Sequence, residues 1–376
     1  IVVFKLMLDR LINLLLPLTQ KTKTSPDETL LVNFWRRSGQ ILVLHGFGLL
    51  MGYFVHFCLV KWMGSKDYGM LSYASSVTAL LGVVVAVGFP VAAVKFVPEL
   101  QVKKNYSELK GFLRFGGWSI LLFSLIVGIL LALMNFKNVL FPGASREVMS
   151  MALIFGLPVS TLVGWQYEVY RGQHKILVPA WLQHLILPML LLLFCWYLFR
   201  LQNYLSVLDV LPIMITVSFL GWFFLAVRQA KKWNLQLKVC KATYPVRNWF
   251  KVSFPLLLTV FFLVIIAHVD ILLVGSLLGP ESAGVSSLSA KVSGLVCVFL
   301  TAANVLAAPL YVHLYTQDKH IEMQRFASRL AHFVFWPSLL VAIVIILSGG
   351  NILEWFGSEF SGGYLVVFFL AIGQLI

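Results

Sequence analysis

The stretch "KWMGSKDYGMLSYASS", residues 61–76, is a short polar break between two long apolar runs. Gly64 directly follows the first run, at a point where a helix that ends in the left-handed conformation needs a residue without Cβ. Ser65 and Asp67 come next, and small polar or acidic side chains are favoured at helix starts and in first turns. The stretch therefore predicts a tight hairpin between two membrane helices.

A second stretch, "LGPESAGVSSLSAK" at residues 278–291, repeats this arrangement. Its glycines, Gly279 and Gly284, follow Gly64 and Gly69 by 215 residues. Six apolar runs separate the start of one hairpin from the start of the other, so both hairpins are expected on the same face of a membrane. Repeats in this relation are parallel, with an axis along the membrane normal. The sparse identity leaves open the alternative that two unrelated turns share glycine and small polar residues.

The apolar runs are long enough to cross a bilayer, which takes about 20 residues of helix. The chain of 376 residues is 60% hydrophobic and 12% charged, whereas soluble domains have about 25% charged residues. The runs stay apolar instead of alternating, which excludes barrel strands. We therefore predict an all-α integral membrane protein with about ten transmembrane helices, as two six-helix lobes related by a parallel repeat, the second lobe incomplete. The runs lie at about residues 41–60, 70–94, 112–135, 148–169, 178–199, 205–227, 252–278, 284–312 and 327–348, and from Gly363 onward.

Positive charge is concentrated on one side of these predicted helices. If the N-terminus is cytoplasmic, 23 of the 29 Lys and Arg residues lie on the cytoplasmic side and five on the other. This asymmetry is what the positive-inside rule expects. We predict a multi-pass protein of the cytoplasmic (inner) membrane with an internal N-terminus, and the basic balance indicates orientation, not nucleic-acid binding.

The chain is predicted to have four parts. In the first, Lys5, Asp9 and Asn13 would form one polar stripe on a helix that lies on the membrane, although an irregular start is an equal alternative. The chain begins with Ile1 and not Met, so we treat both ends as open. The parts are a cytoplasmic or interfacial segment at 1–40, an N-lobe at 41–227, a basic cytoplasmic linker at 228–251 and a C-lobe at 252–376.

Two ionisable residues lie deep inside predicted helices, where each costs about 2.5–3.5 kcal/mol on insertion scales. Asp270 precedes the turn at Gly279 by nine residues, and Lys291 follows it by twelve. At 1.5 Å per residue they lie about 13 and 18 Å below that turn, so they can meet on adjacent antiparallel helices. They form either a structural ion pair or a site in which Lys291 contacts an anionic substrate and Asp270 takes a coupling proton or sodium ion.

Two further basic residues lie near predicted cytoplasmic helix ends. Lys95 is at the end of the second run, and Arg171 follows Glu168 by three residues, so that these two can pair or reach the membrane surface. Basic residues at the cytoplasmic entrance of a transporter attract phosphates, but the positive-inside rule also places basic residues at that end. Both remain candidate substrate-binding residues.

The remaining polar residues of the apolar runs predict no metal or cofactor site. The four cysteines are scattered without the spacing of metal ligands. The histidines in the runs are interpreted as packing or cavity residues, and His268 cannot share a helix face with Asp270, because two residues turn a helix by about 200°. These histidines are His45, His56, His184 and His268.

Several stretches resemble the polysaccharide transporter family, the Wzx-type flippases of the MOP superfamily, from about Phe34 onward. The first hairpin and the second-half segments carry the resemblance, together with the exit of the fourth run. They read "WMGSKDYGMLSYASSVTALLGVVVAVGFPVAAVKFVPE" (62–99), "EVYRGQHKILVPA" (168–180), "HVDILLVGSLLGPESAGVSSLSAKVSG" (268–294) and "WFGSEFSGGYLVVFFLAIGQLI" (355–376).

The resemblance implies a transporter, not an enzyme, that flips polyprenyl-pyrophosphate-linked oligosaccharide across the cytoplasmic membrane by alternating access. Cations in a central cavity would hold the pyrophosphate, with proton or sodium coupling, and the partners would be this lipid-linked substrate and membrane lipids. The family usually has more helices than the ten predicted here, so the chain resembles a truncated member. The alternatives are a multidrug or cation exporter of the same superfamily and a membrane glycosyltransferase or ligase.

Overall fold

The computed structural model describes residues 26–135, 141–173, 175, 177–237, 240–301, 303, 307, 311, 318 and 320–375. The prediction of a polar stripe at Lys5, Asp9 and Asn13 lies outside these residues. Within them every regular element is a helix, which agrees with the predicted all-α class. Nine helices are long and apolar enough to cross a membrane in the described part of the chain.

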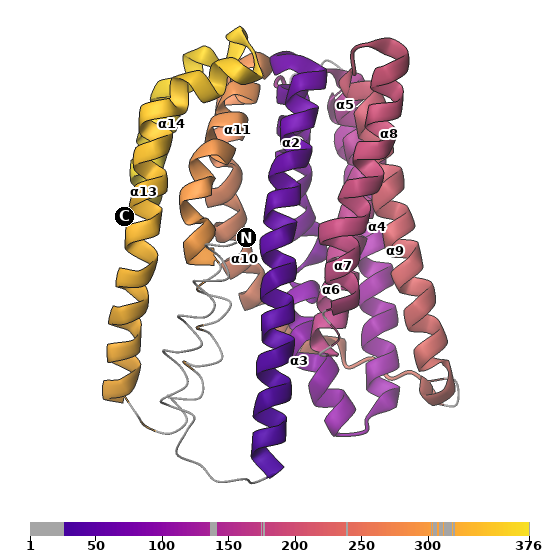
Figure 1. Cartoon of the computed structure of the whole chain (residues 1–376). Helices are drawn as coiled ribbons and strands as arrows, with labels where there is room; N and C mark the ends of the chain where they lie inside the picture. Colours follow the sequence, from indigo (N-terminus) through magenta and orange to yellow (C-terminus); the bar gives the residue numbers. More distant parts are fainter. Residues whose placement is uncertain are drawn as a thin grey trace.

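The helices stand roughly side by side in one bundle (Figure 1). The longer ones in the first half of the chain are α2 (Pro26–Ala86), α3 (Phe89–Val102), α4 (Tyr106–Met134), α6 (Leu157–Gly172), α8 (Leu187–Gln202) and α9 (Val207–Leu237). Those in the second half are α10 (Val246–Leu277), α11 (Pro280–Gly294), α13 (His320–Phe356) and α14 (Tyr364–Leu375). The short elements are α5 (Arg146–Met151), η2 (Ala152–Gly156), α7 (Leu177–Trp181), η3 (Leu182–Ile186), η4 (Leu295–Cys297) and η5 (Ser358–Gly363).

The first predicted hairpin lies inside α2, which is two helices joined at Gly64. The Gly64 backbone has φ 75° and ψ 177°, and Gly279, between α10 and α11, has φ 91° and ψ 177°. This region of positive φ with extended ψ is open essentially to glycine alone. The requirement for glycine is therefore confirmed. The predicted left-handed helical conformation is wrong, because ψ is extended instead of near the roughly 45° of that conformation. Counting the two halves of α2 separately, the described chain has ten apolar helical segments where the sequence predicts ten crossings.

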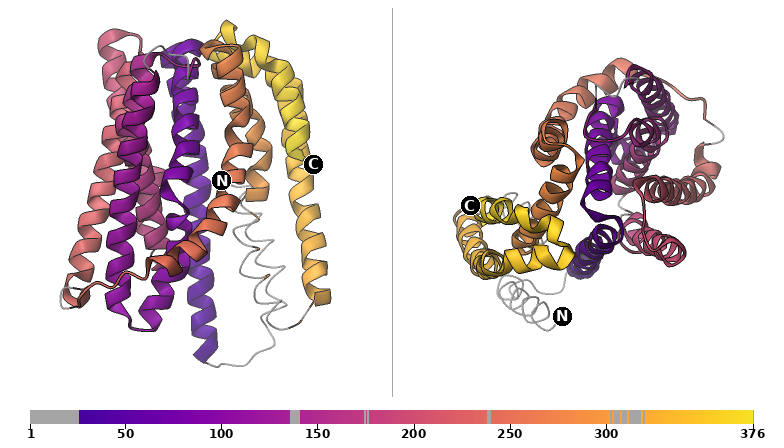
Figure 2. Two further views of the ribbon diagram at one scale, coloured as in Figure 1. Left: turned by 180° about the vertical axis from the view of Figure 1, so that it is seen from behind. Right: turned by 90° about the horizontal axis from the view of Figure 1, so that it is seen from above.

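The two ends of the bundle hold different connections. One end, the hairpin end, holds Gly64, residues 203–206, Gly279 and Gly357, and lies at the top of Figure 1. The opposite end, the linker end, holds residues 103–105 and 240–245 (Figures 1 and 2). The charge asymmetry predicts that the hairpin end is external and the linker end cytoplasmic.

The two hairpins interlock at the hairpin end. A Cβ on Gly69 would lie 1.7 Å from the carbonyl oxygen of Pro280, and a Cβ on Gly284 would lie 2.2 Å from that of Ser65. Each contact is the other shifted by 215 residues, as a two-fold axis between the hairpins would produce. This reciprocity supports the predicted repeat locally, and the repeat of whole lobes stays a prediction.

The predicted linker at 228–251 is largely helical. α9 continues to Leu237, and α10 already begins at Val246. Trp249, in the first turn of α10, is fully buried against Phe112 and Phe115 of α4. The start of α10 is therefore packed on the N-lobe.

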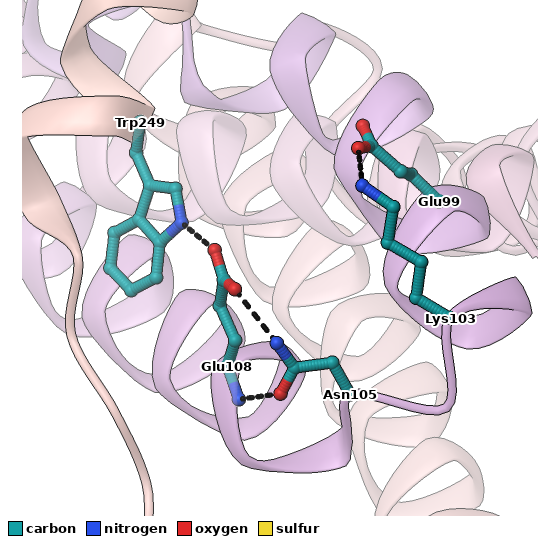
Figure 3. Close-up of polar contacts among 5 residues, drawn as sticks. All are labelled: Glu99, Lys103, Asn105, Glu108 and Trp249. Atoms are coloured by element: carbon teal, nitrogen blue, oxygen red, sulfur yellow. Dashed lines mark hydrogen bonds and ion pairs between the residues drawn. The ribbon is translucent and has the colours of Figure 1, made fainter.

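A polar contact fixes the same point of the linker end (Figure 3). The Trp249 indole Nε1 donates to Oε1 of Glu108 at 3.3 Å, and Asn105 Nδ2 donates to Oε2 of Glu108 at 2.9 Å. Asn105 also caps α4, because its Oδ1 accepts from the backbone N–H of Glu108. Beside this network, the hydrogen bond from Lys103 to Glu99 lowers the pKa of the exposed Glu99 carboxyl.

Replacing Trp249 with alanine is expected to lower the free energy of unfolding by about 3–5 kcal/mol, since a large buried side chain is lost. Trp249→Phe keeps the aromatic packing and removes the bond to Glu108, so it should cost about 1 kcal/mol. Thermal unfolding in detergent micelles measures both. Equal losses for the two variants would show that packing is not the main contribution.

Candidate functional site

Lys291 lies on α11 in the middle of the bundle, half-buried, about 18 Å below the Gly279 turn by helix rise. It lies close enough to His56 and His268 for electrostatic interaction with both rings. Among the residues that the structure describes, no ion pair or hydrogen bond is formed by its ammonium group. A lysine at this depth thus interacts electrostatically with two histidines and has no ion-pair partner among the described residues.

The two histidines are held by hydrogen bonds to the second half of α2. His268 Nδ1 lies 3.1 Å from Ser76 Oγ, and His56 Nδ1 lies 3.3 Å from the phenol oxygen of Tyr68. We call these five residues, Lys291, His56, His268, Ser76 and Tyr68, the Lys291 cluster. The cluster joins helices from the two predicted lobes, α2 on one side and α10 and α11 on the other.

Asp270 adjoins this cluster through electrostatic interaction with His268, but it does not pair with Lys291. No ion pair joins it to Lys291, and its Oδ1 accepts the backbone N–H of Ile271. The expectation that the two would pair is wrong: the His268 ring is directed to Ser76 of α2, and Asp270, two residues further along α10, lies about 200° away around the helix.

A separate pocket of about 470 Å³ lies in the N-lobe. Its walls come from the second half of α2, from α3 and α6, from η3 and from Val260 of α10. Small residues leave space in it, and its polar side chains are four hydroxyls, one amide, one carboxylate and one imidazole. These are Thr78, Ser160, Thr161, Tyr167, Glu168, Gln183 and His184.

Comparison with known proteins decides the family. The profile of a family described as polysaccharide biosynthesis protein matches residues 34–311, which is most of the chain. The chain belongs to the polysaccharide biosynthesis protein family. The family and fold are those of membrane transporters.

A solved structure supports the fold of this polysaccharide biosynthesis family member. The crystal structure of a MATE transporter in complex with MaD3S superposes with a TM-score of 0.51 at 13% sequence identity, over 90% of this chain and 80% of that one. At this identity the likeness shows the fold alone. No curated protein matches the sequence.

In this family member, Lys95 and Arg171 lie apart from the Lys291 cluster. Lys95 is exposed on α3, and Arg171 is in the last turn of α6. The Arg171 guanidinium lies 3.4 Å from the Glu168 carboxylate, so the predicted pair forms. Arg171 adjoins the N-lobe pocket through Glu168, which lines it.

Two π-helical segments each precede a proline, and one of them, η3, lines the pocket. η2 directly precedes the α6 start with Pro158, and η3 directly precedes the α8 start with Pro188. Proline lacks the N–H of a regular helix and clashes with the preceding turn, and a wider π turn relieves both. η3 carries Gln183 and His184, both of which line the pocket. The π turn before Pro188 thus carries two polar residues of the pocket.

Sequence reasoning treated His56, His184 and His268 as packing or cavity residues and gave them no role. A signal was present for two of them. His56 precedes Gly64 by eight residues and His268 precedes Gly279 by eleven, which places them about 12 and 17 Å below their turns, compared with about 18 Å for Lys291. Which helix faces are turned toward one another could not be read from the depth alone.

Proposed function

We propose that this membrane transporter flips a polyprenyl-pyrophosphate-linked oligosaccharide from the cytoplasmic to the external leaflet of the cytoplasmic membrane, with its N-terminus in the cytoplasm. The observation that carries the proposal is Lys291, a half-buried cation at mid-bundle without an acidic partner in the described chain. An unpaired charge at this depth is costly. An anionic group such as a pyrophosphate offsets that cost.

The histidines suit the same role. His56 and His268 each use one ring nitrogen on a hydroxyl of α2, which leaves the other nitrogen available toward a ligand. A neutral imidazole N–H donates to a phosphate oxygen, and a protonated one adds charge. The Lys291 cluster would therefore bind a dianionic group from two lobes at once.

The arrangement of the ends supports alternating access. The hairpin end is closed by the interlocked glycines and by a contact from Ser65 to Glu359. Opening this end while the linker end closes would expose the Lys291 cluster to the other leaflet. Proton or sodium coupling remains part of the proposal, and Asp270, which interacts electrostatically with His268 of the cluster, is a carboxylate in a membrane-spanning helix that could carry it.

The test uses purified protein in proteoliposomes with fluorescent lipid-linked oligosaccharide, whose transfer between leaflets is followed by loss of quenching. Lys291→Ala is expected to lower the initial rate by at least about tenfold, and Lys291→Arg, which keeps the charge, should retain part of it. Lys103→Ala is the matched control, because Lys103 is exposed outside the membrane-spanning helices. An undiminished rate in Lys291→Ala would remove the cluster from the mechanism.

A second candidate is export of organic cations. The observation in its favour is the half-buried Glu168 carboxylate in the N-lobe pocket, since cation binding needs an acidic group. The same liposomes, loaded with a fluorescent quaternary ammonium dye, distinguish the two. Transport of the dye that depends on Glu168 and not on Lys291 would replace the first proposal. No observation on the described residues favours a glycosyltransferase or ligase.

A further inference from the structure

We infer that the N-lobe pocket binds the uncharged saccharide part of the transported lipid, as a subsite distinct from the Lys291 cluster. The inference rests on the proposed function, because it assigns the sugar to one site and the pyrophosphate to the other. Its own evidence is the chemistry, the shape and the position of the pocket.

The polar groups of the pocket suit hydroxyl-rich ligands. In the described chain, neither the Tyr167 phenol nor the Gln183 amide has a hydrogen-bond partner. The hydroxyls of Thr78 and Thr161 donate to backbone carbonyls of their own helices, so their oxygens are left as acceptors. A sugar ring presents both donors and acceptors, and it matches this mixture of amide, phenol and hydroxyl groups.

The charges of the pocket disfavour the two other ligand classes. No Lys or Arg lines it, and its acidic side chain, Glu168, would repel a phosphate. An organic cation is disfavoured in turn, because Arg171 already lies 3.4 Å from that carboxylate. A neutral polar ligand remains, for which the carboxylate serves as a hydrogen-bond acceptor.

Small residues give the pocket its space. Nothing lies within 4 Å of the position that a Cβ on Gly164 would take, and a Cβ on Gly82 would meet Thr161 Cγ2 at 3.1 Å and Leu157 Cδ1 at 4.0 Å. Aliphatic walls from Val83 and Val91 can pack on the C–H face of a ring. The volume of about 470 Å³ falls within the usual range for small-ligand sites.

The pocket and the Lys291 cluster share two helices. On α2, Thr78 of the pocket follows Ser76 of the cluster by two residues, so the two lie at nearly the same depth on different faces of the helix. On α10, Val260 of the pocket lies eight residues before His268, which is about 12 Å of helix. One substrate can therefore place its pyrophosphate at Lys291 and its sugars toward the N-lobe.

The experiment compares binding of two probes to the whole protein in nanodiscs. The first is bare polyprenyl pyrophosphate, and the second is the same lipid with an oligosaccharide, extracted from cells that make the protein. Gly164→Leu fills the pocket without a backbone clash and is expected to weaken binding of the second probe by at least about tenfold, with binding of the first unchanged. Gly373→Leu is the control, since a side chain there also meets open space, away from the pocket.

Gln183→Ala is a second variant in case Gly164→Leu does not fold, because Gln183 is exposed to the pocket and its loss leaves the packing intact. Lys291→Ala should weaken binding of both probes. The oligosaccharide is expected to raise the affinity of the lipid for the unmodified protein. If Gly164→Leu and Gln183→Ala leave this increase in affinity unchanged, or lower the affinity for both probes equally, the inference is wrong. If the unmodified protein binds neither probe, the proposed function itself fails.

Discussion

Replacing Gly69 with alanine is expected to prevent closure of the hairpin end. The new Cβ would lie 1.7 Å from the Pro280 carbonyl oxygen and 2.8 Å from the backbone nitrogen of Gly284. Both are backbone atoms, so no side-chain rotation relieves the overlap. α2 and α11 must move apart along their contact, which exposes the packing between the lobes.

The expected result is an outward-open protein with a lost or strongly reduced flipping rate. Spin labels at Lys66 and Glu281, exposed on the two hairpins, report the separation after the native cysteines are replaced. The distance should lengthen in Gly69→Ala and stay unchanged in Gly52→Ala, where a Cβ meets nothing within 4 Å. An unchanged distance in Gly69→Ala would contradict the interlocked hairpins.

The reciprocal variant sharpens this result. Gly284→Ala places a Cβ 2.2 Å from the Ser65 carbonyl oxygen, so a two-fold arrangement predicts the same opening. If one variant opened the hairpin end and the other did not, the two contacts would not be equivalent, and the repeat would lose its structural support.

Replacing Glu359 with alanine is expected to open the same end by a different route. The Glu359 carboxylate accepts the Ser65 backbone N–H at 3.0 Å and the Ser65 hydroxyl at 2.7 Å. Hydrogen bonds to charged groups contribute about 1.5–3 kcal/mol each. Losing the pair would shift the balance between closed and open forms by roughly a hundredfold or more, since every 1.4 kcal/mol is a factor of ten.

The rate of cross-linking between cysteines at Lys66 and Glu281 measures this shift, and it should fall in Glu359→Ala. Glu359→Gln keeps an acceptor without the charge and should give an intermediate rate, and Ser65→Ala removes only the hydroxyl bond. Glu354→Ala, exposed one turn earlier on α13, is the matched control. Wild-type cross-linking in Glu359→Ala would show that Ser65 and Glu359 do not hold the end closed.

Most of the fold could be predicted from the sequence because apolar length and glycine position act locally. Hydrocarbon thickness dictates how long each run must be, and the positive φ of Gly64 and Gly279 excludes other residues. The structure of the linker at 228–251 could not be predicted in the same way. The burial of Trp249 against α4 depends on residues more than a hundred positions away, so its helical start could not be read locally.

In the candidate site, too, some features could be predicted from the sequence and others depend on tertiary packing. The sequence marked Lys291 as costly at its depth, and it marked the pair of Glu168 and Arg171 through their spacing on one helix. The spacing predicts a pair of Lys291 and Asp270, whereas the structure has no ion pair between them, and both interact electrostatically with His268. Depth follows from counting residues, but the rotation of α10 about its axis is decided by packing against α2.

The sequence by itself determined the membrane class, the ten crossings and the glycine hairpins 215 residues apart, since each follows from short-range chemistry. Only the tertiary structure decided that the hairpins interlock, that His56 and His268 flank Lys291, and that Tyr167, Glu168 and Gln183 line one pocket. The physical reason is that these contacts join helices distant in the chain, whose relative rotation depends on how all their side chains pack together.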